Sequence, residues 1–387
     1  MIDLLYLVPS LYNPGGMERI LTEKINFLVE TSNYKVTVIT TDQNNLPIYF
    51  KLSSKVNVIH LNLDFNAHFD KNVFEKYLVT KKILNKYKLY LEQYIQFNNI
   101  DICISLGGKE LEFFYKLKVN CKKVCELHFS QGVRKQFLTS RSSSFIWKKI
   151  GDYRTQQLIN QTKKLDKLVV LTKADERIWK KTHNNLVQIY NFSPIETDKL
   201  GLLNKKQVLA MGRLDAQKGF DLLIDTWEIV HKKNPDWILN IYGQGEWKEI
   251  LEKKIKNKSL QKKIFLKGVT SNVEEVMLEH SIFVLSSRYE GFAMVLLESI
   301  SCGVPIVSFD CKTGPSEIIT DNDCGFLAKD QDIKHLANGI NKLINNESLR
   351  TNMGKNAKEK SHSFSKEYIM SQWDTLFKEI TNYENTN

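Results

Sequence analysis

Two carboxylates, Glu290 and Glu298, stand eight positions apart around a glycine-aromatic step in the run Arg-Tyr-Glu-Gly-Phe-Ala-Met-Val-Leu-Leu-Glu. The hydrophobic pattern predicts a buried strand over residues 282–287, and after the glycine a helix over residues 293–301. A strand that delivers one acid to the start of a helix, with a second acid along that helix, is typical of a small-molecule site. The free N–H groups at such a helix start favour an anion such as a phosphate.

Two cations stand near a second predicted strand end, in Gly212-Arg-Leu-Asp-Ala-Gln-Lys-Gly219. Arg213 offers a planar bidentate fork and Lys218 a point charge, so the pair suits a diphosphate. The alternative is two solvated surface cations, but the flanking glycines and the strand end before them favour a site. Gly243 also follows a predicted strand, and its missing side chain lets backbone approach a ligand. A plain tight turn explains Gly243 equally well.

The first half of the chain carries two further candidates. Gly15 and Gly16 form a loop with Pro14 between a strand and a helix, and they can pack against the phosphates or sugar of a ligand. A simple turn needs only one glycine, which favours the ligand loop. His128 ends the strand predicted over residues 124–128. A lone histidine is more often structural, and its place at a strand's carboxyl end leaves both interpretations open.

Composition predicts a soluble globular chain. The 387 residues are 42% hydrophobic and 26% charged, and this length favours two domains. No apolar run approaches the roughly 20 residues of a membrane-spanning helix, and the first residues lack the basic leader of a secretory signal. Six cysteines without a C-x-x-C pair suit reduced thiols in the cytoplasm. The net charge of +11 predicts an anionic partner, although a lysine-rich solvated surface explains it as well.

Strands alternate with helices in both halves, which predicts two parallel, doubly wound α/β sheets. The predicted strands cover residues 2–8, 36–40, 56–61, 100–106, 124–128 and 168–171, then 208–211, 238–242, 264–266, 283–285 and 306–308. A polar linker begins at Asn191. Two such domains place a ligand cleft between the carboxyl ends of their sheets. No G-x-G-x-x-G opens either half, which argues against a dinucleotide site.

Metal and membrane signals are weak. Asp321-Asn-Asp323 matches a bare D-x-D pattern but is interpreted as a polar turn. No histidine-cysteine cluster has zinc spacing, so neither metal nor cofactor is expected.

Residues 71–94 mix lysines with aromatics and are best explained as an amphipathic core helix. For residues 131–153 a core helix and an anionic membrane surface both stay open. The residues of this second segment that would meet a membrane are Arg134, Lys135, Trp147, Lys148 and Lys149.

Taken together, the Gly-Gly loop, Gly-Arg-Leu-x3-Lys-Gly, Gly-x-Gly and Glu-Gly-Phe-x5-Glu resemble the family 4 retaining glycosyltransferases of GT-B fold. The resemblance covers essentially the whole chain and is most specific over residues 208–327. It implies two Rossmann-like, doubly wound domains that face each other across a cleft. Residues 1–190 would form the acceptor-side domain and residues 191–365 the nucleotide-sugar-binding domain. Residues 366–387 would form a helix crossing back to the first domain.

The resemblance also implies roles for the candidate residues. The catalytic pair would be Glu290, beside the reacting carbon of the donor sugar, and His128, which would line the sugar site. Glu298 would bind the nucleotide ribose. The other residues implied to bind the donor are Gly15, Gly16, Arg213, Lys218 and Gly243, together with the backbone N–H groups of Phe292, Ala293 and Met294.

The implied reaction moves a sugar from UDP-hexose or UDP-N-acetylhexosamine to a sugar or lipid-linked saccharide without metal. Its product would enter a bacterial surface polysaccharide such as lipopolysaccharide or capsule. The resemblance favours front-face attack over double displacement. Two rivals are a GT-B sugar-nucleotide epimerase and a catalytically silent sugar-nucleotide-binding subunit, and the second is disfavoured by the presence of Arg213, Lys218 and Glu290. We expect a cytoplasmic protein with no nucleic-acid partner, and a peripheral place on the inner face of the membrane stays open.

Overall fold

The computed structural model describes residues 1–31, 33–65, 73–131, 145–320 and 323–382. The chain divides into two compact units. Unit 1 comprises Met1–Tyr190 together with Met370–Asn387, and unit 2 comprises Asn191–Ile369. Each unit is a parallel β-sheet covered by helices on both faces.

The sheet of unit 1 has seven parallel strands among the described residues, in the order β3-β2-β1-β4-β5-β6-β7. The strands are β1 (Ile2–Val8), β2 (Tyr34–Thr40), β3 (Asn57–His60), β4 (Ile102–Ser105), β5 (Lys122–Leu127), β6 (Lys167–Val170) and β7 (Leu186–Gln188). The sequence did not predict β7, because its three half-buried residues are too short to carry a periodic signal.

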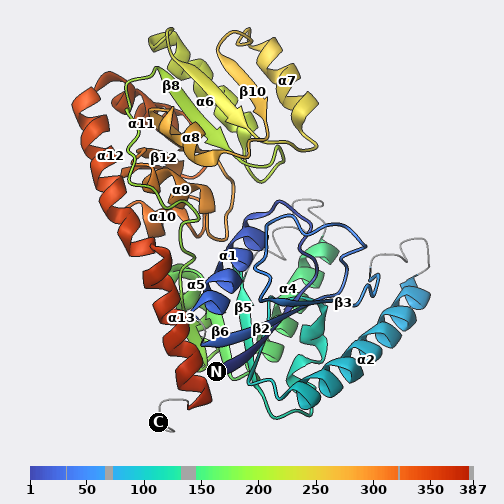
Figure 1. Ribbon diagram of the computed structural model, residues 1–387. Helices are drawn as coiled ribbons and strands as arrows, with labels where there is room; N and C mark the ends of the chain where they lie inside the picture. The colour runs from blue at the N-terminus through green and yellow to red at the C-terminus, as the bar shows by residue number, and fades with distance from the viewer. Residues whose placement is uncertain (32, 66–72, 132–144, 321–322, 383–387) are drawn as a thin grey trace. The chain divides into compact units, whose positions relative to one another are not determined.

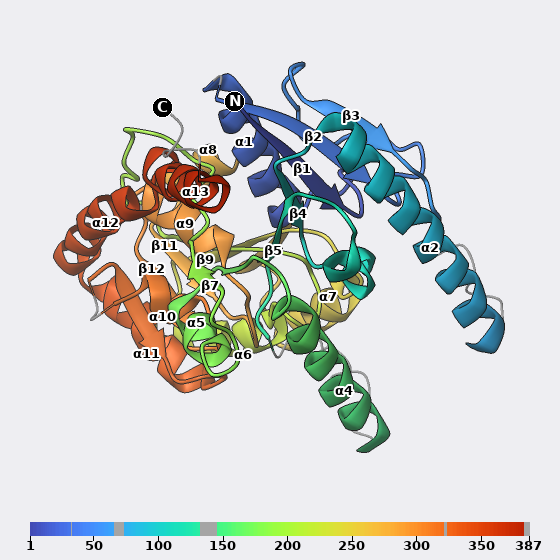
Figure 2. The same cartoon turned by 90° about the horizontal axis from the view of Figure 1, so that it is seen from below.

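Helices cover both faces of this sheet. They are α1 (Gly16–Glu30), α2 (Val73–Asn98), η1 (Lys109–Glu112), η2 (Phe114–Lys116), α4 (Phe145–Thr162), α5 (Lys173–Trp179) and the later part of α13 (Lys366–Thr381). Side chains alternate along each strand, so Leu5 and Leu7 share one hydrophobic cluster with Tyr87 and Leu91 of α2. In Figures 1 and 2, α2 lies on the opposite side of the strands from α1, which has α13 beside it.

Unit 2 repeats the plan with six parallel strands among the described residues, in the order β10-β9-β8-β11-β12-β13. The strands are β8 (Gln207–Met211), β9 (Ile238–Tyr242), β10 (Ile264–Gly268), β11 (Ile282–Leu285), β12 (Ile306–Phe309) and β13 (Gly325–Ala328). The helices are α6 (Phe220–Lys233), α7 (Lys248–Asn257), α8 (Val273–Leu278), α9 (Met294–Ser301), α10 (Pro315–Ile318), α11 (Ile333–Asn345), α12 (Glu347–Ser361) and η3 (His362–Phe364).

Both strand orders reverse direction at one point, between β1 and β4 in unit 1 and between β8 and β11 in unit 2. In open parallel sheets a crevice forms outside the carboxyl ends of the strands at this point, because successive connections leave toward opposite faces. The observed sheets confirm the predicted fold class of two Rossmann-like α/β domains. A ligand site in unit 2 is therefore expected at the loops that follow β8 and β11.

Candidate functional site

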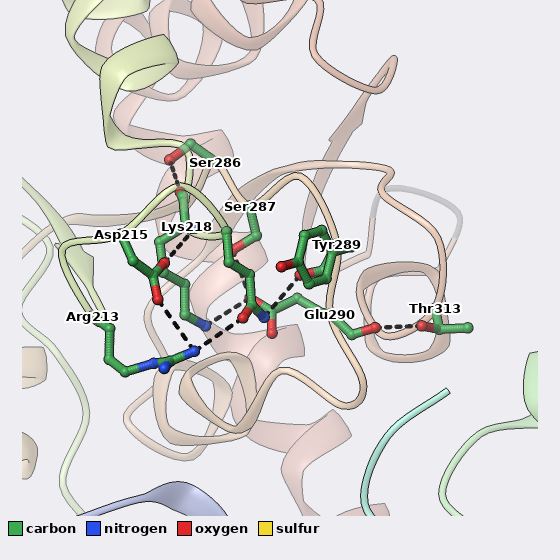
Figure 3. A network of polar contacts seen from close by, with 9 residues as sticks. Arg213, Asp215, Lys218, Ser286, Ser287, Tyr289, Glu290 and Thr313 are labelled. Atoms are coloured by element: carbon green, nitrogen blue, oxygen red, sulfur yellow. Dashed lines mark hydrogen bonds and ion pairs between the residues drawn. The ribbon is translucent and has the colours of Figure 1, made fainter. Parts of the chain in front are cut away.

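An ion pair joins the loops that follow β8 and β11. Lys218 Nζ lies 2.8 Å from Glu290 Oε1, and Ser287 Oγ donates a hydrogen bond of 2.5 Å to the same oxygen (Figure 3). The side chains are 14% exposed for Lys218 and 6% for Glu290. The structure thus brings together two of the predicted site residues, which lie 72 positions apart in the chain.

A third loop, after β12, holds the backbone of Glu290. Thr313 Oγ1 donates a hydrogen bond of 2.5 Å to the Glu290 carbonyl. Gly314 has φ +101°, and a Cβ there would lie 3.4 Å from Glu290 Cβ. The position of the Glu290 side chain is therefore set by contacts to three loops at the carboxyl edge of the sheet.

Arg213 lies beside this pair with its side chain 70% exposed. Its Nη2 donates to Gln217 Oε1 at 3.0 Å and lies 3.2 Å from Asp215 Oδ2. Asp215 also accepts from the Lys218 backbone N–H at 3.2 Å, which ties the two ends of the loop together (Figure 3). The guanidinium is oriented by these contacts and keeps other donors for an anionic ligand.

Arg288 fastens the two loops to each other, a role that sequence reasoning missed. Its guanidinium forms a bidentate pair with Asp221 at 2.9 and 2.7 Å and donates to the Ala216 carbonyl at 2.8 Å. Burial would raise the pKa of Asp221, but the hydrogen bonds and charge of Arg288 lower it below its ordinary value. An arginine two positions before the acid was visible in the sequence, but its partner was not.

Helix α9 begins directly after the acid loop. Ala293 precedes the helix, and no side chain caps its N-terminus. Phe292 and Ala293 are buried, and Met294 is the first helical residue. Glu298 lies one turn further along and is 6% exposed. The predicted order of acid, helix start and second acid is present, while the contacts of Glu298 with a ribose stay a prediction.

Gly243 has a packing reason to be glycine. Its φ is +148°, and a Cβ there would lie 1.8 Å from the carbonyl oxygen of Gly212. The loops after β8 and β9 pass too close for any side chain at this point. This contact explains the residue without a ligand, so its predicted donor contact stays a prediction.

We expect Gly243→Ala to lower the free energy of unfolding by about 2–4 kcal/mol, because the methyl group collides with backbone that cannot move independently. Gly268→Ala is the matched control: φ is +74° there, but nothing lies within 4 Å of the added Cβ. That variant bears only the dihedral cost of about 1–2 kcal/mol. Chemical denaturation measures both, and equal losses would contradict the packing explanation.

The two glycines predicted in unit 1 lie at the start of α1. Gly15 precedes the helix without a side-chain cap, and Gly16 is its first residue. A Cβ at Gly15 would lie 2.2 Å from Glu18 Oε2, so this glycine makes room for a buried carboxylate of the first helical turn. Their contact with a diphosphate stays a prediction.

His128 follows β5 directly, since the strand ends one residue earlier than predicted, at Leu127. Its side chain is 7% exposed, and Nε2 lies 3.0 Å from Glu126 Oε1. Glu126 also contacts the ammonium group of Lys24. Sequence reasoning missed both partners. The available signal was a charged residue within the buried apolar run at residues 124–127 of β5, and a lysine on the apolar face of α1.

The remaining predictions concern metal and membrane. Of the proposed D-x-D turn, Asp321 and Asn322 lie outside the described residues, and within the described ranges no group of three or more His, Cys, Asp and Glu could hold a metal ion. On α4, Trp147, Lys148 and Lys149 are exposed. Arg134 and Lys135 lie outside the described part of the chain. Membrane binding by this segment stays a prediction, which co-flotation with anionic liposomes at low and high salt tests.

No helix in the part of the chain that the structure describes combines the length and apolar character that a membrane crossing requires.

Comparison with known proteins places this site in a recognised domain. Residues 193–360 match the family Glycosyl transferases group 1. The Erwinia amylovora protein called amylovoran biosynthesis glycosyltransferase AmsD is 28% identical over 97% of this chain and 99% of its own length. An uncharacterized glycosyltransferase of Haemophilus influenzae is 27% identical over 95% and 98%.

Among solved structures, a variant of S. aureus TarM in complex with fondaparinux, alpha-GlcNAc-glycerol and UDP has a TM-score of 0.76. It is 19% identical, and the match covers 97% of this chain and all of the other. The two units therefore have the GT-B type of fold.

Proposed function

We propose that this chain, whose residues 193–360 form a group 1 glycosyltransferase domain, is a family 4 retaining glycosyltransferase. Its donor would be UDP-hexose or UDP-N-acetylhexosamine, and its acceptor a sugar or lipid-linked saccharide of a bacterial surface polysaccharide. The observation that carries the proposal is the Lys218–Glu290 pair at the strand-order reversal of unit 2, with the exposed guanidinium of Arg213 beside it.

The leaving group of such a reaction is a nucleoside diphosphate, on which negative charge develops as the bond to the sugar breaks. Lys218, Arg213 and the uncapped N-terminus of α9 would stabilise this charge. Fixed cations of this kind can act without a metal ion. Glu298 would accept hydrogen bonds from the ribose hydroxyls.

Glu290 would position the donor sugar and balance charge beside the anomeric carbon. One of its oxygens already faces the Lys218 ammonium at 2.8 Å and the Ser287 hydroxyl at 2.5 Å. Both partners draw electron density from the carboxylate and make it a poorer nucleophile. This supports front-face attack: the acceptor oxygen bonds to the anomeric carbon on the face that the diphosphate leaves, and the acceptor's proton passes to the leaving phosphate.

The relatives support the substrate class. The name of AmsD refers to the biosynthesis of amylovoran, and the TarM structure is a complex with alpha-GlcNAc-glycerol and UDP. We propose by analogy that this chain also acts in polysaccharide synthesis and uses a UDP-sugar donor. The roles of Gly15, Gly16, Gly243 and His128, and a peripheral place on the inner face of the membrane, belong to the proposal as well.

An assay with UDP-glucose, UDP-galactose and their N-acetylated forms, together with saccharide and lipid-diphosphate acceptors, tests the proposal. We expect UDP release with formation of an α-glycoside, and no loss of activity in EDTA. A β-glycoside would contradict retention, and loss of activity in EDTA would contradict metal independence. Release of a free epimerised sugar would favour the epimerase, and UDP-sugar binding without turnover would favour the silent subunit.

A further inference from the structure

Three ionisable side chains meet inside unit 1. Lys24 comes from α1, Glu126 from β5, and His128 from the residue after β5. The side chains of Lys24 and Glu126 are each 1% exposed, and that of His128 is 7% exposed. One oxygen of Glu126 contacts the Lys24 ammonium, and the other lies 3.0 Å from His128 Nε2. The carboxylate therefore lies between a fixed cation and the imidazole. His128 Nε2 is within ion-pair distance of Glu126 but is not aligned for a hydrogen bond among the described residues.

The C-terminal helix covers this cluster. Lys24 Nζ lies 3.8 Å from the centre of the Trp373 ring of α13 and 5.4 Å from that of Tyr6. Trp373 is itself buried, so water is kept from the ammonium while the two rings offer it their negative faces. Four separate segments of unit 1 thus fix the position of one ion pair.

Stability alone does not explain a buried pair of this kind. Removing two charges from water costs several kcal/mol for each ion, and well-packed apolar side chains of similar volume often serve as well or better. Burial lowers the pKa of Lys24, and it would raise that of Glu126. Lys24 and His128 outweigh the effect of burial on Glu126 and hold its pKa well below its usual range. The carboxylate is therefore ionised at neutral pH where it touches His128.

We propose that Glu126 is a positioning residue for His128, with Lys24 as its fixed countercharge. The proposal rests on the proposed function, in which His128 contacts the donor sugar. Glu126 would restrict the imidazole to one orientation and one tautomer, because a carboxylate beside Nε2 favours the proton on that nitrogen. Nδ1 would then be left as the acceptor. Lys24 prevents the carboxylate from turning away, since it holds the second oxygen.

The double variant Lys24→Met/Glu126→Gln removes both charges with little change in volume and leaves no unpaired ion behind. We expect its kcat to fall by at least about tenfold, with the donor KM changed less than about threefold, because misplacement of a reacting group acts on turnover. In a His128→Ala background the same double change should have no further effect on kcat, since residues that act as a unit are not additive.

A wild-type kcat in the double variant would overturn the proposal. So would a fall in kcat that is the same whether the double change is made in the wild type or in the His128→Ala background. Glu30→Gln is the matched control, because Glu30 lies on the same helix as Lys24 and forms an exposed pair with Lys55. It should leave kcat and melting temperature unchanged.

A second readout does not depend on activity. Long-range ¹H–¹⁵N spectra of the imidazoles, with His128 assigned from a His128→Gln variant, report its tautomer. We expect the Nε2-protonated form in the wild type and a mixture of tautomers in the double variant. Identical His128 spectra would overturn the proposal. If the spectra change as expected while the wild type transfers no sugar, the positioning role stands and the proposed function fails.

Discussion

The Lys218→Ala variant is expected to lose about 10²–10³-fold in kcat/KM for the nucleotide-sugar donor, the range found when one preorganised charge-stabilising group is removed. The Lys218 side chain is 14% exposed and its ammonium is fixed by Glu290 at 2.8 Å, so it needs little reorganisation to meet the diphosphate. Its loss also leaves the Glu290 carboxylate near the phosphates without a countercharge. Both effects weaken donor binding and raise the barrier, so kcat and KM should change together.

Stability must be separated from binding in this variant. The Glu290 side chain is 6% exposed, and without Lys218 its carboxylate keeps the hydrogen bond from the Ser287 hydroxyl but loses its countercharge, so some loss of stability is expected. Arg213→Ala provides a second arm: this side chain is 70% exposed, and its removal should weaken UDP binding with little change in melting temperature. Lys248→Ala on α7, where the lysine is 63% exposed, is the control cation.

Isothermal titration with UDP, thermal melts and donor kinetics together decide the outcome. Wild-type affinity for UDP in both Lys218→Ala and Arg213→Ala would refute the diphosphate assignment. A fall in melting temperature with unchanged affinity would leave Lys218 as a structural partner of Glu290 only.

Glu290→Gln is expected to lower kcat by about 10²–10³-fold while UDP affinity stays the same or increases. Glutamine keeps the shape of the side chain and can still accept the Ser287 hydrogen bond. It lacks the charge that balances the oxocarbenium-like sugar in the transition state. It also releases the Lys218 ammonium from its ion pair, which makes that group more available to the phosphates. A loss of turnover without a loss of binding is the signature of a group that acts in the transition state.

Glu279→Gln is the matched control, because Glu279 is 54% exposed and pairs with Lys205 in the same unit. Glu279→Gln should leave both kcat and the affinity for UDP unchanged. Wild-type turnover in Glu290→Gln would remove the proposed role of this acid. A covalent glycosyl adduct on Glu290, detected by mass spectrometry after rapid quenching with donor, would contradict front-face attack and favour double displacement.

The order of elements could be predicted from the sequence because apolar periodicity and glycine breaks are local signals. β1 and β9 have the predicted bounds, and α9 begins one residue later than predicted. β7 was missed because three half-buried residues carry no pattern. The strand predicted to reach residue 287 ends at Leu285. The hydroxyls of the two serines that follow donate hydrogen bonds to the Lys218 carbonyl and to the Glu290 carboxylate.

The candidate site was predictable in its chemistry and less so in its contacts. Acid, cations and glycines follow strand ends, where a parallel sheet exposes its ligand-binding edge. The roles of Arg288 and Thr313 could not be predicted from the sequence, because they depend on hydrogen-bond partners that come near only after folding.

By itself, the sequence determined which residue types stand at the carboxyl ends of the strands, since strand and loop identity follow from short-range patterns of hydrophobicity and turn residues. Only the tertiary structure decided that Lys218 pairs with Glu290 and that Glu126 lies between Lys24 and His128. Those partners lie on loops and elements whose neighbours are set by strand order. Strand order depends on how the helices cover the two faces of each sheet, which no local pattern in the chain encodes.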